Sequence, residues 1–158
     1  MQIDREGILF MQNTNDVAEK AGQLYAGKYH CCEAIVLAVS EYMGMNDDLL
    51  LKISTPFGGG MTGNGATCGS LLAAYICMGA FKGRSSENES RKDACEPANR
   101  IFHKFCQKYG SPNCSDIVGY DKNDPKSVEL YGQKVKQEVC IPLVKEVTRW
   151  ILEELMHE

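Results

Sequence analysis

The sequence contains the stretch Phe57-Gly58-Gly59-Gly60-Met61-Thr62-Gly63-Asn64-Gly65-Ala66-Thr67-Cys68-Gly69-Ser70, in which five of the eight residues from 58 to 65 are glycine and one cysteine follows. Glycine adopts backbone conformations that other residues resist, including positive φ, at an entropic cost. A chain that accepts this cost just before a cysteine is expected to shape the space around that sulfur. The apolar run from Leu71 to Phe81 then predicts a helix.

Cys68 is the first candidate for a reactive thiol. Thr67 is the expected N-cap of the following helix, which would place Cys68 in the first turn. The free N–H groups and the helix dipole at that position favour an anion. For a thiol the anion is the thiolate, which is the reactive and metal-binding form.

The spacing of apolar residues predicts helices along most of the chain. The expected helices cover about residues 13–27, 31–43, 47–54, 68–82, 87–109, 126–137 and 142–156, with a single helical turn at 114–118. Pro97 predicts a kink in the 87–109 helix, or a later start near Glu96. No stretch alternates as a strand does, and the loops are short. The predicted fold is therefore all-α: a single domain over residues 1–158, built as a bundle of about six to seven helices. The glycine-rich loop would precede a central apolar helix that others cover.

Composition and charge exclude several classes of function. The chain has 158 residues, 44% of them apolar, which is enough for one domain with a real core. A net charge of -4 argues against a nucleic-acid partner. No window approaches the roughly 18 apolar residues of a membrane span. The first residues, Met-Gln-Ile-Asp-Arg-Glu, do not resemble a signal peptide, so we expect a cytoplasmic protein.

The eight cysteines separate into two groups by position. In a reducing compartment, dispersed cysteines are core residues, metal ligands or redox-active thiols. Four of them lie at predicted helix N-termini, where the thiol pKa falls: Cys32, Cys68, Cys114 and Cys140. Cys77, Cys95 and Cys106 are expected in the core. Cys31 must point elsewhere on the helix than its neighbour Cys32, and packing or partial exposure is expected for it.

The same four positions carry a resemblance to a known family. The segments Cys32–Val36, Phe57–Met61, Cys68–Ala73, Gly110–Cys114 and Val139–Val144 resemble the redox-active protein family named for its C_GCAxxG_C_C pattern. The resemblance covers about residues 15 to 155 and implies that Cys32, Cys68, Cys114 and Cys140 are the family's four characteristic cysteines. The chain departs from the CGAxxG-like motif at two places, where Ser70 replaces the alanine and Ala73 the second glycine.

Two kinds of chemistry suit four such thiols. The first is cysteine-based redox, by thiol–disulfide exchange or electron transfer with a partner protein or a small thiol or disulfide. Cys68 would be the nucleophile and Cys32 its partner through packing of their helices, while Cys114 and Cys140 would form a second pair or a relay. The alternative is a metal-binding protein in which Cys32, Cys68, Cys114 and Cys140 hold zinc or an iron–sulfur cluster. His30 and His103 are possible supplementary ligands.

A third hypothesis is a structural disulfide protein or interaction module, which leaves the glycine-rich loop unexplained. Gly58-x-Gly60-x-x-Gly63 matches the dinucleotide-binding fingerprint, but that signal requires a preceding strand in a βαβ unit. A backbone nest that holds an anion remains open. Gly58, Gly59, Gly60 and Gly69 are therefore candidate contacts for a bound cofactor.

Overall fold

The computed structural model describes residues 2–3, 9–10, 13–45, 48–119, 121 and 123–157. Helices dominate them, as predicted, and the fold is all-α. The elements are β1 (Gln2–Ile3), β2 (Leu9–Phe10), α1 (Thr14–Ala26), α2 (Cys31–Tyr42), α3 (Asp48–Ser54), η1 (Thr55–Phe57), α4 (Gly58–Met61), α5 (Gly69–Lys82), α6 (Lys92–Tyr109), α7 (Cys114–Val118), α8 (Pro125–Leu130), η2 (Tyr131–Cys140) and α9 (Ile141–Met156).

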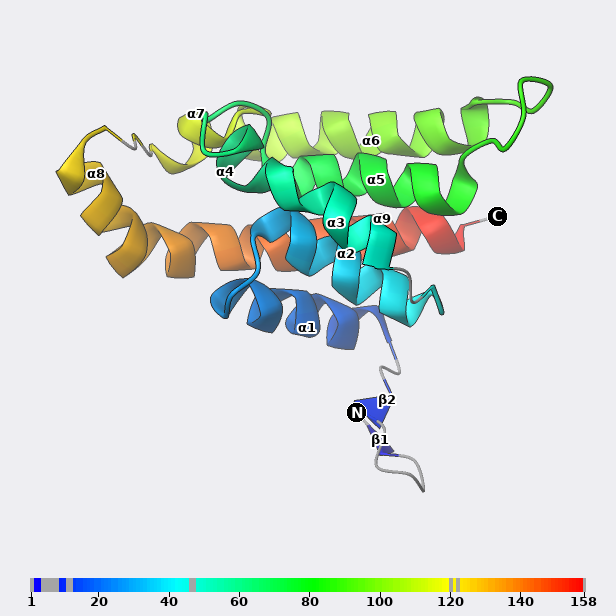
Figure 1. The fold of residues 1–158 in the computed structure, drawn as a ribbon, viewed down its shortest axis with the longest axis horizontal. Coiled ribbons are helices and arrows are strands. Elements are labelled where there is room, and N and C mark those ends of the chain that lie inside the picture. The colour runs from blue at the N-terminus through cyan, green and yellow to red at the C-terminus, as the bar shows by residue number, and fades with distance from the viewer. Residues whose placement is uncertain are drawn as a thin grey trace.

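Helix α5 lies at the centre of the helical arrangement (Figure 1). It packs against α6 on one side and against α2 and α9 on the other, and α1 covers α2 and α9. Leu71 and Met78 are among its fully buried residues, which confirms the predicted central helix. Cover is incomplete, however, because Tyr75 is 43% exposed. One face of α5 therefore reaches the surface although its sequence is apolar nearly all round.

The helix boundaries agree with the expected ones in most places. Asn13 caps α1 by accepting hydrogen bonds from the N–H groups of Asn15 and Asp16. Helix α6 begins at Lys92, which is later than residue 87 but earlier than Glu96, and Pro97 lies inside the helix. The expected caps of α3, Asn46 and Asp47, lie outside the described residues.

The last third of the chain differs from the prediction. Two helices were expected, with Cys140 at the mouth of the second, but α8, η2 and α9 follow one another without a break. Cys140 has helical angles (φ -72°, ψ -41°). The η2 segment is a π-helix, and its wider turn lets the N–H of Ile141 reach the carbonyl of Lys136. The chain thus continues as a helix through Pro142, which itself donates no hydrogen bond.

The glycine-rich loop opens with a short helical turn instead of an irregular loop. Gly59, Gly60, Met61 and Thr62 all have left-handed backbone angles, with φ between 57° and 68°. Glycine adopts this region freely, whereas each L-residue there costs about 1–2 kcal/mol. The glycines therefore make possible a turn of the opposite hand just before Cys68.

Strand structure is minimal in the part of the chain that is described. β1 and β2 form a two-residue antiparallel pair, and Thr67 and Asn113 form an isolated bridge. These short pairings leave the predicted all-α fold unchanged.

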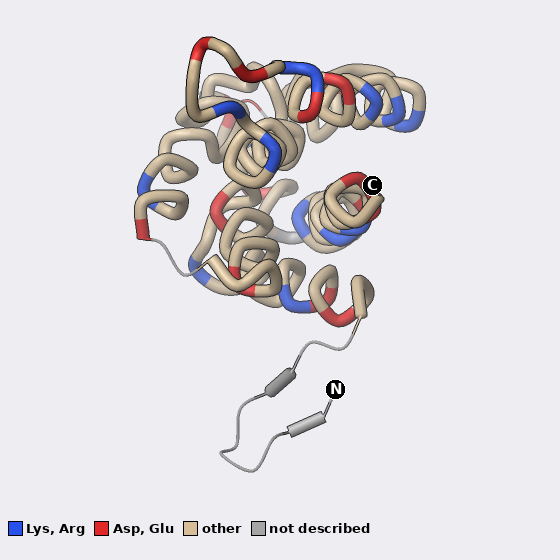
Figure 2. The backbone as a smooth tube through the Cα atoms, turned by 90° about the vertical axis from the view of Figure 1, so that its right-hand side faces the viewer, with Lys and Arg blue, Asp and Glu red and all other residues tan. Residues whose placement is uncertain are grey.

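Acidic and basic residues are interspersed along the outer helices (Figure 2). Several of them form ion pairs between α6 and α9, such as Arg100 with Glu154 and Lys108 with Glu146. Within the described ranges, none of the helices combines the length and the hydropathy that a membrane crossing requires.

Candidate functional site

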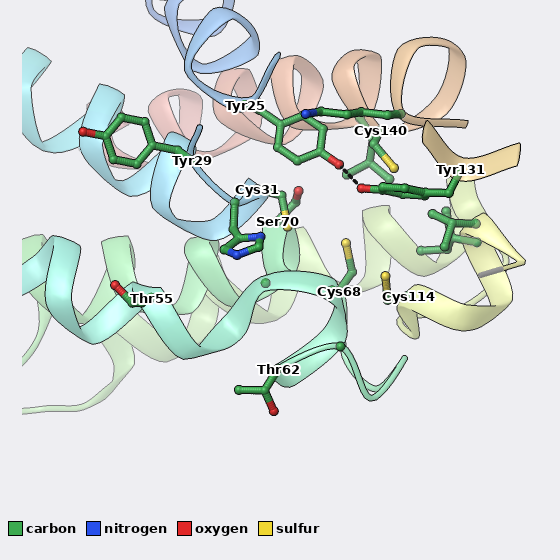
Figure 3. Close-up of a pocket in the computed structure, with 18 of the residues that line it drawn as sticks. Tyr25, Tyr29, Cys31, Thr55, Thr62, Cys68, Ser70, Cys114, Tyr131 and Cys140 are labelled. Carbon is green, nitrogen blue, oxygen red and sulfur yellow. Dashed lines mark hydrogen bonds between the residues drawn. The ribbon is translucent and has the colours of Figure 1, made fainter. Parts of the chain in front are cut away.

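A pocket of about 600 Å³ opens between the glycine-rich loop, the start of α2 and the η2–α9 helix. Four cysteines from distant parts of the chain line it: Cys31, Cys68, Cys114 and Cys140. Figure 3 shows the Cys68 and Cys114 side chains on one wall and Cys140 on the opposite wall, beside Tyr131. The fold therefore gathers four thiols into one space.

The pocket contains Cys31 where the sequence predicted Cys32. Cys32 is fully buried in the core, and burial raises its pKa, followed by charge on Cys31 and on Cys77. Cys31 is half-buried and lines the pocket. Consecutive residues of a helix point about 100° apart, so only one of the pair can face the pocket. Of the four predicted site residues, the structure thus brings together Cys68, Cys114 and Cys140 and leaves Cys32 behind the wall.

The start of α2 is fixed by contacts from three segments. His30 is the N-cap residue, and its N–H donates to Glu33 Oε2 at 2.8 Å. Thr55 Oγ1 donates to the other carboxylate oxygen of Glu33 at 2.9 Å. The His30 ring packs on Gly58, where a Cβ would lie 2.4 Å from its Cγ. These contacts set the direction in which Cys31 points.

Backbone hydrogen bonds join the Cys68 and Cys114 segments directly. The Cys68 N–H donates to the Pro112 carbonyl at 2.8 Å, and the Cys114 N–H donates to the Ala66 carbonyl at 2.7 Å. This is the pattern of an antiparallel bridge, and in such a bridge the two cysteines project to the same face. The proximity of the two thiols is therefore a property of the backbone.

The glycines make room for neighbouring protein atoms at several points. A Cβ on Gly60 would lie 2.7 Å from Cys114 Cβ, and one on Gly69 would lie 2.5 Å from Cys31 Sγ. These two predicted cofactor contacts are thus occupied by the protein's own cysteines. Gly58 and Gly59 line the pocket. Since Gly69 directly follows Cys68, its missing side chain lets Cys31 approach that residue.

Burial raises the pKa of every pocket thiol. The pKa of Cys114 rises to about 12, and those of Cys31, Cys68 and Cys140 also rise. Cys68 is the N-cap residue of α5, the position at which Thr67 was expected, so the helix begins at Gly69. The N–H groups of Ser70 and Leu71 lower its pKa, but burial exceeds their effect. The expectation of low thiol pKa values from helix N-termini is therefore wrong for the protein in this state.

Two tyrosines and a lysine lie around Cys140, and none of the three was predicted as a site residue: Tyr25, Tyr131 and Lys136. The hydroxyls of Tyr25 and Tyr131 hydrogen-bond to each other at 2.5 Å beside the Cys140 sulfur (Figure 3). Burial raises the Cys140 pKa most, whereas both hydroxyls and the Lys136 ammonium lower it. Lys136 also lies 5.1 Å from the Tyr25 ring centroid.

The remaining candidates lie in varied surroundings. Cys77 is buried in the core as predicted. Cys95 is exposed and Cys106 half-buried, so the core assignment is wrong for Cys95 and only partly right for Cys106. His30 lines the pocket, whereas His103 lies outside it against Phe102.

The sulfurs do not form a preassembled metal site. Among the residues that the structure describes, no three Cys, His, Asp or Glu side chains are arranged to hold one ion. A zinc ion or an iron–sulfur cluster would therefore require the thiols to rearrange.

Comparison with known proteins gives one match. The family described as "Putative redox-active protein (C_GCAxxG_C_C)" matches residues 29–154. No curated protein and no solved structure is detectably similar to the chain. The matched region contains all four pocket cysteines, the glycine-rich loop and nearly all of α9. The chain therefore belongs to the C_GCAxxG_C_C family of redox-active proteins.

Proposed function

We propose that the protein carries out thiol–disulfide exchange in this pocket, with Cys68 as the attacking thiol. The observation that carries the proposal is the convergence of Cys31, Cys68, Cys114 and Cys140 on one space. Residues so far apart in sequence meet only because the fold brings them together. Membership of a redox-active family is consistent with this assignment.

Cys68 is the thiol expected to ionise first. Besides burial, charge on Cys68 raises the pKa of Cys31, of Cys114 and of Cys140. These repulsions are mutual, so the pocket favours only one thiolate at a time. The N–H groups of Ser70 and Leu71 favour the Cys68 thiolate. A single thiolate in this pocket would therefore lie on Cys68.

The reaction is written as two exchanges. The Cys68 thiolate attacks one sulfur of a substrate disulfide, forms a mixed disulfide and releases one thiolate, which takes up a proton. A second pocket thiol loses its proton, attacks the Cys68 sulfur and releases the other half of the substrate as a thiol. Two electrons pass from the protein to the substrate, and the protein retains an internal disulfide. An external dithiol then reduces this disulfide and completes the cycle.

Cys31 is our candidate for the second thiol. Its sulfur packs against Gly69, the residue next to Cys68. After burial, the largest influence on its pKa is charge on Cys68. The proposed pair still joins α2 to the start of α5, as expected, but its α2 cysteine is Cys31 and not Cys32.

The test uses the fully reduced protein under anaerobic conditions with one equivalent of bis(2-hydroxyethyl) disulfide. A Cys95→Ala background removes the exposed thiol, and mass spectrometry after alkylation at low pH locates each modified cysteine. We expect Cys68→Ala to abolish the reaction, while Cys77→Ala leaves the modified positions unchanged. Disulfide consumption that is unaffected by Cys68→Ala would overturn the proposal.

A further inference from the structure

We infer that the pocket takes a small disulfide that carries carboxylate groups, which rests on the proposed thiol–disulfide exchange and specifies its substrate class. Three observations support the inference: the charge of the pocket wall, a buried hydroxyl beside Cys68, and the depth at which Cys68 lies.

The pocket wall is basic in a protein that is acidic overall. The chain has a net charge of -4. Yet of the described residues, Lys28 and Lys136 line the pocket together with His30, and no Asp or Glu does. Neither lysine has an ion-pair partner in the described ranges, in contrast to the paired charges between α6 and α9. A cleft lined by one sign of charge concentrates ligands of the opposite sign.

Ser70 places a buried hydroxyl beside the Cys68 sulfur. Its side chain is 1% exposed and lines the pocket. Its Oγ lowers the pKa of Cys68 and makes no other hydrogen bond to a described residue. It lies at the N-terminus of the 14-residue helix α5, where the dipole favours negative charge. The Cys68 thiolate, or an anion bound beside it, would accept a hydrogen bond from Ser70.

The position of Cys68 favours a small molecule over a disulfide on a protein surface. Cys68 is only 7% exposed, so a substrate must enter the pocket to reach its sulfur. A volume of about 600 Å³ lies within the range of pockets that enclose small organic ligands. A carboxylate-bearing disulfide of this size can place its sulfurs at Cys68 while a charged end reaches Lys136.

The test compares three disulfides that share a two-methylene arm on each sulfur and differ in their end groups. These are 3,3′-dithiodipropionate, bis(2-hydroxyethyl) disulfide and cystamine, which are anionic, neutral and cationic at neutral pH. Lysine contacts worth about 1.5 kcal/mol would make Cys68 react roughly tenfold faster with the anionic compound than with the neutral one. Lys136→Met should remove most of this preference, measured as the ratio of the anionic to the neutral rate. Lys52→Met, which changes an exposed lysine outside the pocket, should leave both rates unchanged.

A second readout does not depend on redox chemistry. Suberate has the shape of dithiodipropionate with two methylene groups in place of the sulfurs, and its binding to the Cys68→Ala variant is measured by calorimetry. We expect suberate to bind and Lys136→Met to weaken it. Equal rates for the three disulfides and no suberate binding would overturn the inference while leaving the proposed exchange intact. Suberate binding without any reaction at Cys68 would overturn the exchange and keep the anion site.

Discussion

The adjacent pair Cys31 and Cys32 gives the sharpest test of the site, because alanine at each position should have opposite effects. Cys32 is fully buried, so Cys32→Ala leaves a small void and should lower the free energy of unfolding by about 1 kcal/mol. For a domain of this length, that loss lowers the melting temperature by about 3 °C. Cys31 is half-buried at the pocket, and Cys31→Ala should cost less than about 0.5 kcal/mol.

In the reaction with a disulfide, Cys31→Ala should have the large effect and Cys32→Ala the small one. With bis(2-hydroxyethyl) disulfide, Cys32→Ala should still form the internal disulfide and release two thiols. Cys31→Ala should stop at the mixed disulfide on Cys68, which intact-mass measurement detects as one retained half of the reagent. Urea unfolding of the reduced variants measures the stability terms. The reasoning is refuted if Cys32→Ala stops at the mixed disulfide and Cys31→Ala proceeds.

Three other predictions address the packing and charge of the site. Gly69→Ala should destabilise the protein by about 2 kcal/mol, because its methyl would lie 2.5 Å from the Cys31 sulfur. Gly79→Ala in the same helix meets nothing within 4 Å and should stabilise the protein by up to about 1 kcal/mol. Urea unfolding compares the two variants, and equal effects would contradict the close packing around Gly69. Tyr131→Phe removes a hydroxyl that lowers the pKa of Cys140, so alkylation of Cys140 at fixed pH should slow, and an unchanged rate would argue against the contact. Burial raises the pKa of Cys77 to about 12, whereas the thiol of the unfolded chain ionises from about pH 8.5, so folding stability falls as pH rises between these values. Between about pH 8 and 10, the free energy of unfolding of the wild type should fall by roughly 2 kcal/mol more than that of Cys77→Ala. Parallel pH profiles of the two proteins would contradict this.

The sequence was sufficient for most of the fold, because periodicity and punctuation agree locally. Gly27, Pro56 and Gly110 mark helix ends, and the apolar run from Leu71 identifies the central helix. The error at Cys140 has a physical cause. Pro142 is typical of a helix start, but the π-helical segment before it lets one helix continue through the proline.

The site could be predicted only in part. The glycine-rich loop correctly indicated close packing around Cys68, and three of the four predicted cysteines line the pocket. The choice between Cys31 and Cys32 depends on how α2 is rotated against α5, and that rotation is set by tertiary contacts. The direction of the thiol pKa shifts depends on burial, which helix position alone does not reveal. Tyr131 reaches Tyr25 only through the long helix that ends the chain.

The convergence of the four thiols has a consequence for the order of events in biogenesis. In an unfolded chain, closing a short loop costs less entropy than closing a long one. Cysteines close in sequence, such as Cys106 and Cys114, would then pair more readily than Cys31 and Cys68. Oxidation of a nascent chain would therefore trap pairings that prevent the pocket from forming. The proposed exchange therefore requires that the chain fold with its thiols reduced before the pocket acquires a disulfide.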